Sequence, residues 1–333
     1  MRALPKFGLL LLLLLAITCT TAEPPAPEVL VGEGEHVYAW IDDWAQLPEG
    51  DALGSMHGQV AVDSSGRVYV QTEGELAVRV FASDGAYLRG FGSEWAGGLH
   101  GLAIAREGER EVLWMTHIVQ GVLLKTTLEG EELLRVGCPM ESGLYERAEQ
   151  YHPTSVAVSS DGTVYVGDGY GLSYIHRYTS AGEYLGSFAG RGRARGQLRN
   201  PHGLWVAPSR TGEVLLCADR ENNRLVSFAL DGTPLRSWTE GVMRPTFVQP
   251  REDLLAMADI EGKLTLYTRA GELLTHLGAN PHAELRDRKD VPPEELLPGR
   301  FASPHGLAWA PDGSLYVVEW LEQGRITKLE PRP

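Results

Sequence analysis

A pair of apolar strands joined by a polar turn occurs six times between Gly58 and the end of the chain. The spacings between successive copies are 42, 54, 48, 44 and 59 residues, close to the roughly 40 to 50 residues of a four-stranded propeller blade. Further strand-like runs and Gly-containing turns follow each pair. The repeat therefore predicts an all-β fold, a six-bladed β-propeller. The first residues of the copies, here called the anchor residues, are Gly58, His100, Thr154, His202, Thr246 and His305.

The two ends of the chain fit together in this scheme. The sixth copy supplies only three strand-like runs before Pro333, whereas the run His36–Ile41 precedes the first copy. We expect this run to complete the last blade and close the ring, because closure removes exposed strand edges. The predicted organisation is a signal peptide at residues 1–22, a linker at 23–35 and the propeller at 36–333.

The N-terminal segment has the pattern of a secretory signal. Arg2 and Lys6 precede an apolar run, residues 8–17, that is too short to cross a bilayer as a mature helix. Thr20-Thr-Ala22 resembles a signal-peptidase site, which predicts a secreted or periplasmic protein. The alternative is a lipoprotein anchored to the membrane through Cys19, for which Thr18 is a poor preceding residue.

The net charge argues against a nucleic-acid-binding protein, and the cysteine content leaves room for at most one disulfide in the propeller. With 30 basic and 44 acidic residues, the net charge is −14, which disfavours nucleic acid as a partner. The basic loop Arg191-Gly-Arg-Ala-Arg195 is interpreted as a solvated turn. Export permits a disulfide between Cys138 and Cys217, but their positions do not require one. We expect a monomer that binds a small molecule or peptide at the mouth of its channel.

Histidine occupies every second anchor position: His100, His202 and His305. In a sixfold ring these side chains would be related by an approximate threefold axis at one mouth of the channel. Three imidazoles that converge on one point suit Zn²⁺ with an open fourth position. A purely structural residue should instead occur in all six copies. The other histidines are interpreted as surface or packing residues, with His57 and His117, near the channel strands, as possible exceptions.

Several motifs then resemble a known family. The copies look like NHL-type propeller repeats, and the motifs resemble those of peptidyl-α-hydroxyglycine α-amidating lyase, also called peptidylamidoglycolate lyase. The motifs are Asp168-Gly-Tyr-Gly171, Pro201-His-Gly-Leu204, Ala218-Asp-Arg-Glu-Asn222 and Ser303-Pro-His-Gly-Leu307. The resemblance implies a carbon–nitrogen lyase that forms a peptide amide and glyoxylate. It also implies zinc held by His100, His202 and His305, with Tyr170 and Arg220 as catalytic residues.

The sequence departs from the family at several positions. Thr72 stands where the family has a second catalytic arginine, and Arg79 follows a few residues later. Gly306 replaces an aspartate that helps to hold calcium in the family, which argues against Ca²⁺ here. Gly171 and Ser227 stand where the family has paired cysteines. These differences keep a second hypothesis open: a non-catalytic propeller that binds a peptide, glycan or protein. A lactonase or other hydrolase is a weaker third.

Four carboxylates end the second strand-like run of their copies: Asp168, Asp219, Asp259 and Glu319. Recurrence at one position favours a structural role over catalysis. We therefore expect these side chains to hydrogen-bond the backbone between blades.

Overall fold

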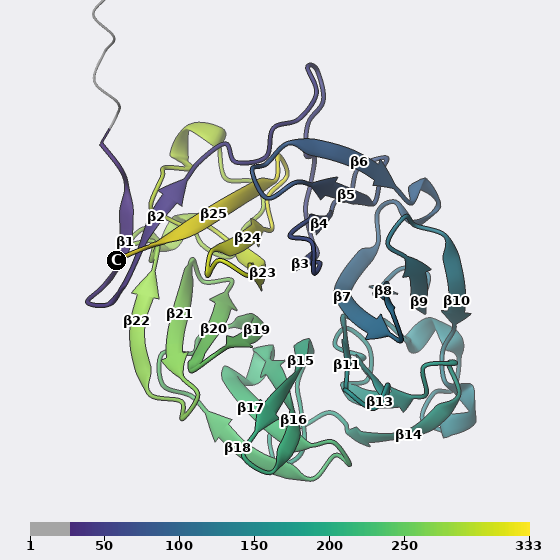
Figure 1. The fold of residues 1–333 in the computed structure, drawn as a ribbon. Coiled ribbons are helices and arrows are strands. Elements are labelled where there is room, and N and C mark those ends of the chain that lie inside the picture. Colours follow the sequence, from purple (N-terminus) through teal and green to yellow (C-terminus); the bar gives the residue numbers. More distant parts are fainter. Residues whose placement is uncertain (1–26) are drawn as a thin grey trace, which may run out of the picture.

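Antiparallel strands and short turns make up nearly all of residues 27–333, the part of the chain that the computed structural model describes. The predicted signal peptide and Cys19 lie outside these residues. The strands form six sheets arranged in a ring around a central axis (Figure 1). The predicted all-β, six-bladed propeller is therefore confirmed.

Each of the first five blades is a four-stranded antiparallel meander whose first strand is innermost. Blade 1 contains β3 (Val60–Val62), β4 (Val68–Gln71), β5 (Val78–Phe81) and β6 (Tyr87–Phe91). Blade 2 contains β7 (Leu99–Glu107), β8 (Arg110–His117), β9 (Val122–Thr127) and β10 (Glu132–Val136). Blade 3 contains β11 (Ser155–Val158), β12 (Val164–Gly167), β13 (Tyr174–Tyr178) and β14 (Tyr184–Ala189). Blade 4 contains β15 (Pro201–Ser209), β16 (Gly212–Asp219), β17 (Arg224–Ala229) and β18 (Pro234–Trp238). Blade 5 contains β19 (Pro245–Arg251), β20 (Leu254–Asp259), β21 (Lys263–Thr268) and β22 (Leu273–Leu277).

Blade 6 combines the two ends of the described chain. It contains β23 (Pro304–Trp309), β24 (Leu315–Glu319) and β25 (Arg325–Arg332), followed outward by β2 (His36–Ile41) and β1 (Leu30–Glu33). In the antiparallel pairing of β2 with β25, Val37 lies opposite Arg332. The strand β1 corrects the expectation of a linker at residues 23–35. It forms because the turn Gly34-Glu35, with Gly34 at φ 61°, folds the segment back onto β2.

The hairpin turns follow from local chemistry. Between β11 and β12, Gly162 adopts φ 86°, a conformation that glycine tolerates without strain. Asp161 accepts a hydrogen bond from the Thr163 backbone N–H at 3.0 Å, as expected of aspartate in a turn. Gly66 and Gly313 have φ values of 86° and 87° in the corresponding turns of blades 1 and 6.

Apolar side chains form the cores between neighbouring blades. Within residues 27–333, six of the seven clusters of buried residues lie at the junctions between adjacent sheets, one at each junction. At the junction of blades 3 and 4, for example, Tyr165 and Ile175 pack against Leu204 and Leu215. Because each strand is buried by a neighbouring blade, the position of every inner strand is fixed by packing on both sides.

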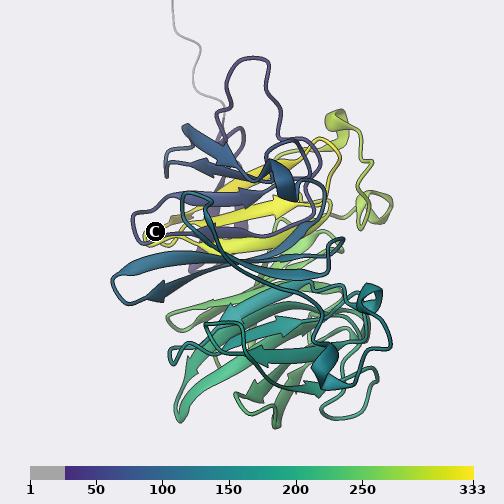
Figure 2. The same ribbon diagram turned by 90° about the vertical axis from the view of Figure 1, so that its right-hand side faces the viewer.

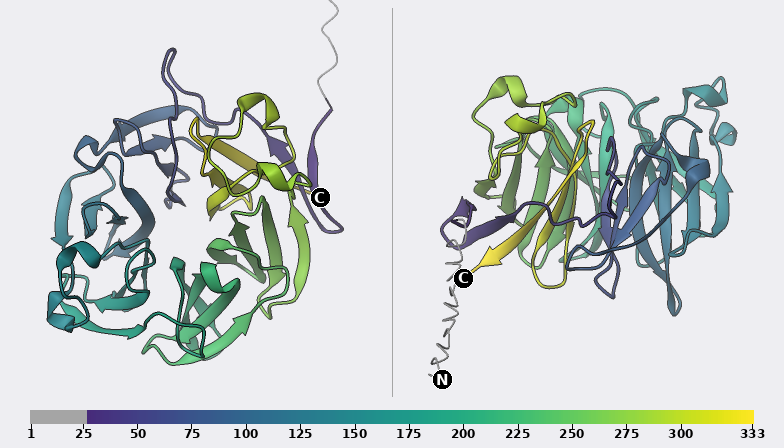
Figure 3. Two further views of the ribbon diagram at one scale, coloured as in Figure 1. Left: turned by 180° about the vertical axis from the view of Figure 1, so that it is seen from behind. Right: turned by 90° about the horizontal axis from the view of Figure 1, so that it is seen from above.

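Short helical turns interrupt the connections between strands: η1 (Ser93–Trp95), η2 (Met140–Ser142), η3 (Ala148–Gln150), η4 (Arg220–Asn222), η5 (Ala283–Leu285) and η6 (Pro293–Glu295). Among residues 27–333, no helix has the length and apolar character needed to cross a membrane. The long connection at residues 278–303, drawn in yellow-green, projects from one face of the ring (Figures 2 and 3). Cys138 and Cys217 are both free thiols, so the optional disulfide is not formed.

Candidate functional site

The three histidine anchors begin the innermost strands of blades 2, 4 and 6, and all three side chains are fully buried. A glycine follows each of them because the next blade approaches closely at this point. A Cβ atom at Gly101 would lie 2.6 Å from Ser155 Cα, and one at Gly203 would lie 2.4 Å from the Thr246 carbonyl oxygen. Packing thus requires the glycine of the repeated His-Gly-Leu motif, because only glycine lets neighbouring inner strands come this close.

This contact orients each imidazole. The Nδ1 atom of His100 lies 2.6 Å from the Thr154 carbonyl oxygen, that of His202 lies 2.9 Å from the Thr246 carbonyl oxygen, and that of His305 lies 3.0 Å from the Gly58 carbonyl oxygen. A carbonyl oxygen only accepts hydrogen bonds, so Nδ1 carries the proton and Nε2 has a free lone pair. The anchors of the odd-numbered blades therefore supply the carbonyls that fix the histidines of the even-numbered blades.

The threonine anchors continue the connection around the ring. The Thr154 hydroxyl donates to the Pro201 carbonyl oxygen at 2.8 Å, and the Thr246 hydroxyl donates to the Pro304 carbonyl oxygen at 3.2 Å. Each proline directly precedes a histidine anchor. Consecutive anchors from His100 round to Gly58 thus form a hydrogen-bonded belt, in which threonine hydroxyls link the histidine positions. The belt stays open at Gly58, which has no side chain to donate.

The three imidazoles form a nearly equilateral group. Their ring centroids are 4.7 Å apart for His100 and His202, 4.7 Å for His202 and His305, and 4.9 Å for His100 and His305. Burial lowers the pKa of all three well below 6.5, so the rings are neutral at neutral pH. The Nε2 atom of His305 is buried without a hydrogen-bond partner. Neutral imidazoles with fixed Nδ1 atoms and inward lone pairs fit the donor set of a zinc ion.

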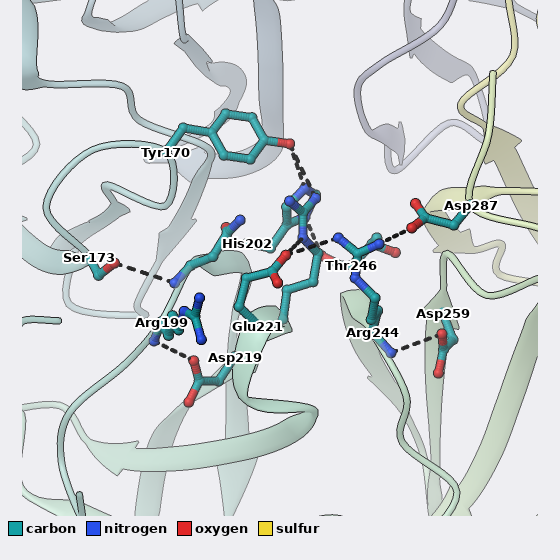
Figure 4. A network of polar contacts seen from close by, with 12 residues as sticks. Tyr170, Ser173, Arg199, His202, Asp219, Glu221, Arg244, Thr246, Asp259 and Asp287 are labelled. Atoms are coloured by element: carbon teal, nitrogen blue, oxygen red, sulfur yellow. Dashed lines mark hydrogen bonds and ion pairs between the residues drawn. The ribbon is translucent and has the colours of Figure 1, made fainter. Parts of the chain in front are cut away.

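Tyr170 reaches this group from the loop between β12 and β13. Its hydroxyl lies 3.0 Å from His202 Nε2 (Figure 4). It also lies 3.2 Å from His100 Nε2. The flanking glycines leave no room for side chains: a Cβ atom at Gly171 would lie 2.2 Å from an Asp168 carboxylate oxygen. Burial raises the pKa of Tyr170, and the charge of Arg220 opposes that rise.

Arg220 begins the helical turn η4 directly after β16. Its Nη1 atom donates to the Tyr170 hydroxyl oxygen at 3.3 Å, and its guanidinium carbon lies 5.4 Å from the Tyr170 ring centroid. Glu221 accepts from Arg220 Nε at 3.2 Å and from Arg244 Nη2 at 2.9 Å. Arg244 also pairs with Asp287, so two cations and two carboxylates line this side of the site (Figure 4).

A cavity of about 280 Å³ adjoins the tyrosine. Arg191 and Arg199 contribute exposed guanidinium groups to its lining, and Asn200 contributes a buried side-chain oxygen that has no hydrogen-bond partner. Arg191 belongs to the basic loop that was interpreted as a solvated turn. The arginines of this loop are exposed, as a solvated turn requires, and Arg191 at one end also lines the cavity beside Tyr170.

The structure therefore brings all five predicted site residues together: His100, His202, His305, Tyr170 and Arg220. It adds His57, whose Nε2 atom lies 3.2 Å from the Tyr170 hydroxyl oxygen. In the sequence, His57 could be identified by its position one residue before the Gly58 anchor. Arg244 was missed, although it similarly lies two residues before the Thr246 anchor.

The structure shows the surroundings of residues at which the sequence departs from the family. Thr72 is buried and its hydroxyl donates to the Leu76 carbonyl oxygen at 2.8 Å. Arg79 forms two hydrogen bonds with Asp51, at 2.6 and 3.0 Å. A Cβ atom at Gly306 would lie 2.9 Å from the Gly58 carbonyl oxygen, so close packing favours glycine there. Neither Thr72 nor Arg79 places a cation beside Tyr170.

The four recurring carboxylates accept hydrogen bonds from the backbone as expected, but from segments of their own blades and not between blades. Asp168 accepts from the N–H groups of His152 and Leu172 at 2.8 and 2.6 Å. Asp219 accepts from Arg199 N–H at 2.7 Å. Asp259 and Glu319 likewise accept from the segments that enter blades 5 and 6. These side chains tie the end of each second strand to the start of its blade.

Sequence comparisons identify amidating enzymes as relatives. The chain is 28% identical to peptidyl-alpha-hydroxyglycine alpha-amidating lyase 2 of Drosophila melanogaster over 244 residues, which cover 72% of this chain and 56% of the fly protein. It is 33% identical to peptidylglycine alpha-amidating monooxygenase of Rattus norvegicus over 142 residues, or 40% of this chain and 14% of the rat protein. The chain thus matches only part of these relatives. No protein-family model matches it.

Solved structures share the fold at low sequence identity. A streptogramin B lyase matches with a TM-score of 0.56 and 15% identity, covering 90% of this chain and 87% of the lyase. A gluconolactonase from Xanthomonas campestris matches with a TM-score of 0.60 and 14% identity, covering 90% and 91%. These relatives and neighbours are enzymes. The chain is therefore similar in sequence to amidating lyases and in fold to propeller enzymes, which confirms the resemblance inferred from its motifs.

Proposed function

We propose that the chain is an exported zinc-dependent lyase that cleaves peptidyl-α-hydroxyglycine to a peptide amide and glyoxylate. One observation carries this proposal. Three buried, neutral imidazoles present free Nε2 atoms beside a tyrosine hydroxyl that also contacts an arginine. The sequence similarity to an amidating lyase supports the same reaction class.

His100, His202 and His305 would hold the zinc ion through their Nε2 atoms, because each Nδ1 atom is engaged by a backbone carbonyl. When bound, zinc would supply Lewis-acid chemistry that favours loss of the proton from a nearby hydroxyl group. The buried belt of anchors keeps the three rings fixed, so little reorganisation is needed when a ligand arrives.

Tyr170 is placed to move the proton. The reaction breaks the bond between the α-carbon and the amide nitrogen, the electron pair stays on nitrogen, and the hydroxyl proton must reach that nitrogen. The phenol can accept a proton from one group and donate one to another. Arg220 donates to the same phenol oxygen, which stabilises negative charge there during the transfer.

The cavity beside Tyr170 offers a place for the substrate. A peptidyl-α-hydroxyglycine ends in a carboxylate, and guanidinium groups bind carboxylates in a planar fork. Arg191 and Arg199 line the cavity, and the unpartnered oxygen of Asn200 can accept an N–H group of the peptide. These groups supply a cationic surface although Thr72 replaces the family arginine.

The test is release of glyoxylate from a peptidyl-α-hydroxyglycine by zinc-loaded protein. We expect Tyr170→Phe to lower kcat by roughly 100- to 10,000-fold, the range for loss of a general acid–base group, while zinc content is retained. His282→Ala serves as a control, because His282 is exposed and pairs with Glu284. A zinc-loaded wild-type protein that releases no glyoxylate above background would favour the non-catalytic binding propeller instead.

A further inference from the structure

His57 is a fourth histidine at the proposed metal site, although it is not an anchor residue. It comes from the segment that leads into β3 of blade 1. Its ring centroid lies 4.8 Å from that of His100 and 4.9 Å from that of His305. The ligand atoms of His57, His100 and His305 all lie within 4.8 Å of one another. The cluster of candidate metal ligands therefore extends beyond the three repeated positions.

The orientation of His57 matches that of the three anchors. Its Nε2 atom points inward and lies 3.2 Å from the Tyr170 hydroxyl oxygen, which also contacts the Nε2 atoms of His100 and His202. Its Nδ1 atom faces a carboxylate oxygen of Glu73 at 3.8 Å. Histidines that bind metals usually direct the second ring nitrogen to a carboxylate or carbonyl group. His57 has a carboxylate on this side of its ring, beyond hydrogen-bond distance at 3.8 Å, whereas the anchors have hydrogen-bonded carbonyl groups.

Glu73 is itself held in place. Its backbone N–H donates to the Ser55 carbonyl oxygen at 2.8 Å, and the Ser55 hydroxyl donates to its carboxylate at 2.5 Å. The carboxylate is the negative charge next to a group of otherwise neutral rings. The charge of a divalent cation bound by the imidazoles would therefore be partly compensated by the Glu73 carboxylate. An exposed histidine beside an unrestrained carboxylate would not provide such a fixed negative charge.

We propose that His57 is a fourth imidazole ligand of the metal ion held by His100, His202 and His305, with Glu73 as its positioning residue. This inference rests on the metal site of the proposed function and extends it. A substrate hydroxyl would then need a fifth position on the ion, an expansion that catalytic zinc sites allow. The ion would then join four blades, because His57 comes from blade 1 and the anchors come from blades 2, 4 and 6. A set of imidazole ligands suits zinc and neighbouring first-row cations.

The experiment measures metal binding and requires no substrate. Apo-protein is titrated with Zn²⁺ against a chromophoric chelator, and with Co²⁺ while the visible absorption spectrum is recorded. Loss of a ligand in His57→Ala should weaken zinc binding by more than about 100-fold, and Glu73→Gln should weaken it by about 10-fold, the lower end for a group that orients a ligand. The Co²⁺ spectrum should change in His57→Ala. The matched control His282→Ala removes an exposed histidine that also faces a glutamate, at 3.4 Å, and should change neither quantity.

Wild-type zinc affinity and an unchanged Co²⁺ spectrum in His57→Ala would overturn the proposal, as would failure of the wild-type protein to bind either ion. His57→Gln, which retains a polar side chain of similar reach, and circular dichroism of each variant guard against loss of folding. Failure of the proposed function has a different signature. A protein that shows the predicted metal affinities but releases no glyoxylate retains the four-histidine site and loses only the lyase assignment.

Discussion

Blades 1 and 4 lie on opposite sides of the channel and use equivalent strand positions for different chemistry (Figure 1). The strand pairings place Gly58 at the position of His202 and Thr72 at the position of Asp219. One residue further, Glu73 stands where blade 4 has Arg220. The repeat therefore sets where side chains enter the site, and the individual residues set the charge that each side provides.

The two sides present different groups to Tyr170. On the side of blade 4, Arg220 contacts Tyr170, and Arg244 is tied to it through Glu221. On the side of blade 1, Glu73 faces His57. A substrate at the channel mouth would thus meet cations on one side and an oriented imidazole with its carboxylate on the other.

The largest expected effect is on catalysis, from the loss of Arg220 on the side of blade 4. Arg220→Ala should lower kcat/KM for glyoxylate release by about 100- to 1,000-fold, as for loss of one preorganised donor, whereas Glu73→Gln at saturating zinc should change it far less. Arg220→Lys keeps the charge and should recover part of the activity. Equal losses in Arg220→Ala and Glu73→Gln would show that the two sides do not differ in this way.

The next largest effect is expected on the free energy of unfolding, from Asp219 at the end of the second strand of blade 4. Asp219 is buried and accepts from Arg224 Nε at 2.6 Å and from Arg199 N–H at 2.7 Å. Asp219→Ala should lower the free energy of unfolding by about 3–5 kcal/mol, because it leaves a largely buried arginine without its partner. Urea denaturation measures this change. A loss below about 1 kcal/mol would mean that the carboxylate is not a structural tie.

The contacts of these residues show which features of the fold and the site can be predicted from the sequence. The repeat predicted the blades and the convergence of His100, His202 and His305, because strand period and ring symmetry place equivalent residues together. The repeat gives the positions of Glu73 and Arg244 but not their partners, since their roles depend on loop conformations that bring them to His57 and Glu221. The strand β1 was missed because Gly32 and Gly34 make its sequence resemble a linker.

Blade 2 offers a third version of the same position, where His117 stands in place of the aspartate. Burial lowers the pKa of His117 from 6.5 to about 4. The unfolded chain then binds more protons than the folded protein between these values, so stability falls as the pH is lowered from about 6.5 to about 4. Allowing for solvent screening, wild type should lose about 2 kcal/mol more than His117→Gln over this range. Parallel pH profiles in urea denaturation would contradict the prediction.

The smallest effect is expected in blade 1. The Thr72 hydroxyl donates to the Leu76 carbonyl oxygen at 2.8 Å within its own loop, and no charged partner depends on it. Thr72→Val keeps the shape of the side chain and removes one hydrogen bond, which should lower the free energy of unfolding by about 1 kcal/mol. Thermal denaturation beside Asp219→Ala provides the measurement. Similar losses in the two variants would mean that blade 1 is tied as strongly at this position as blade 4, and that the difference between them is confined to the site.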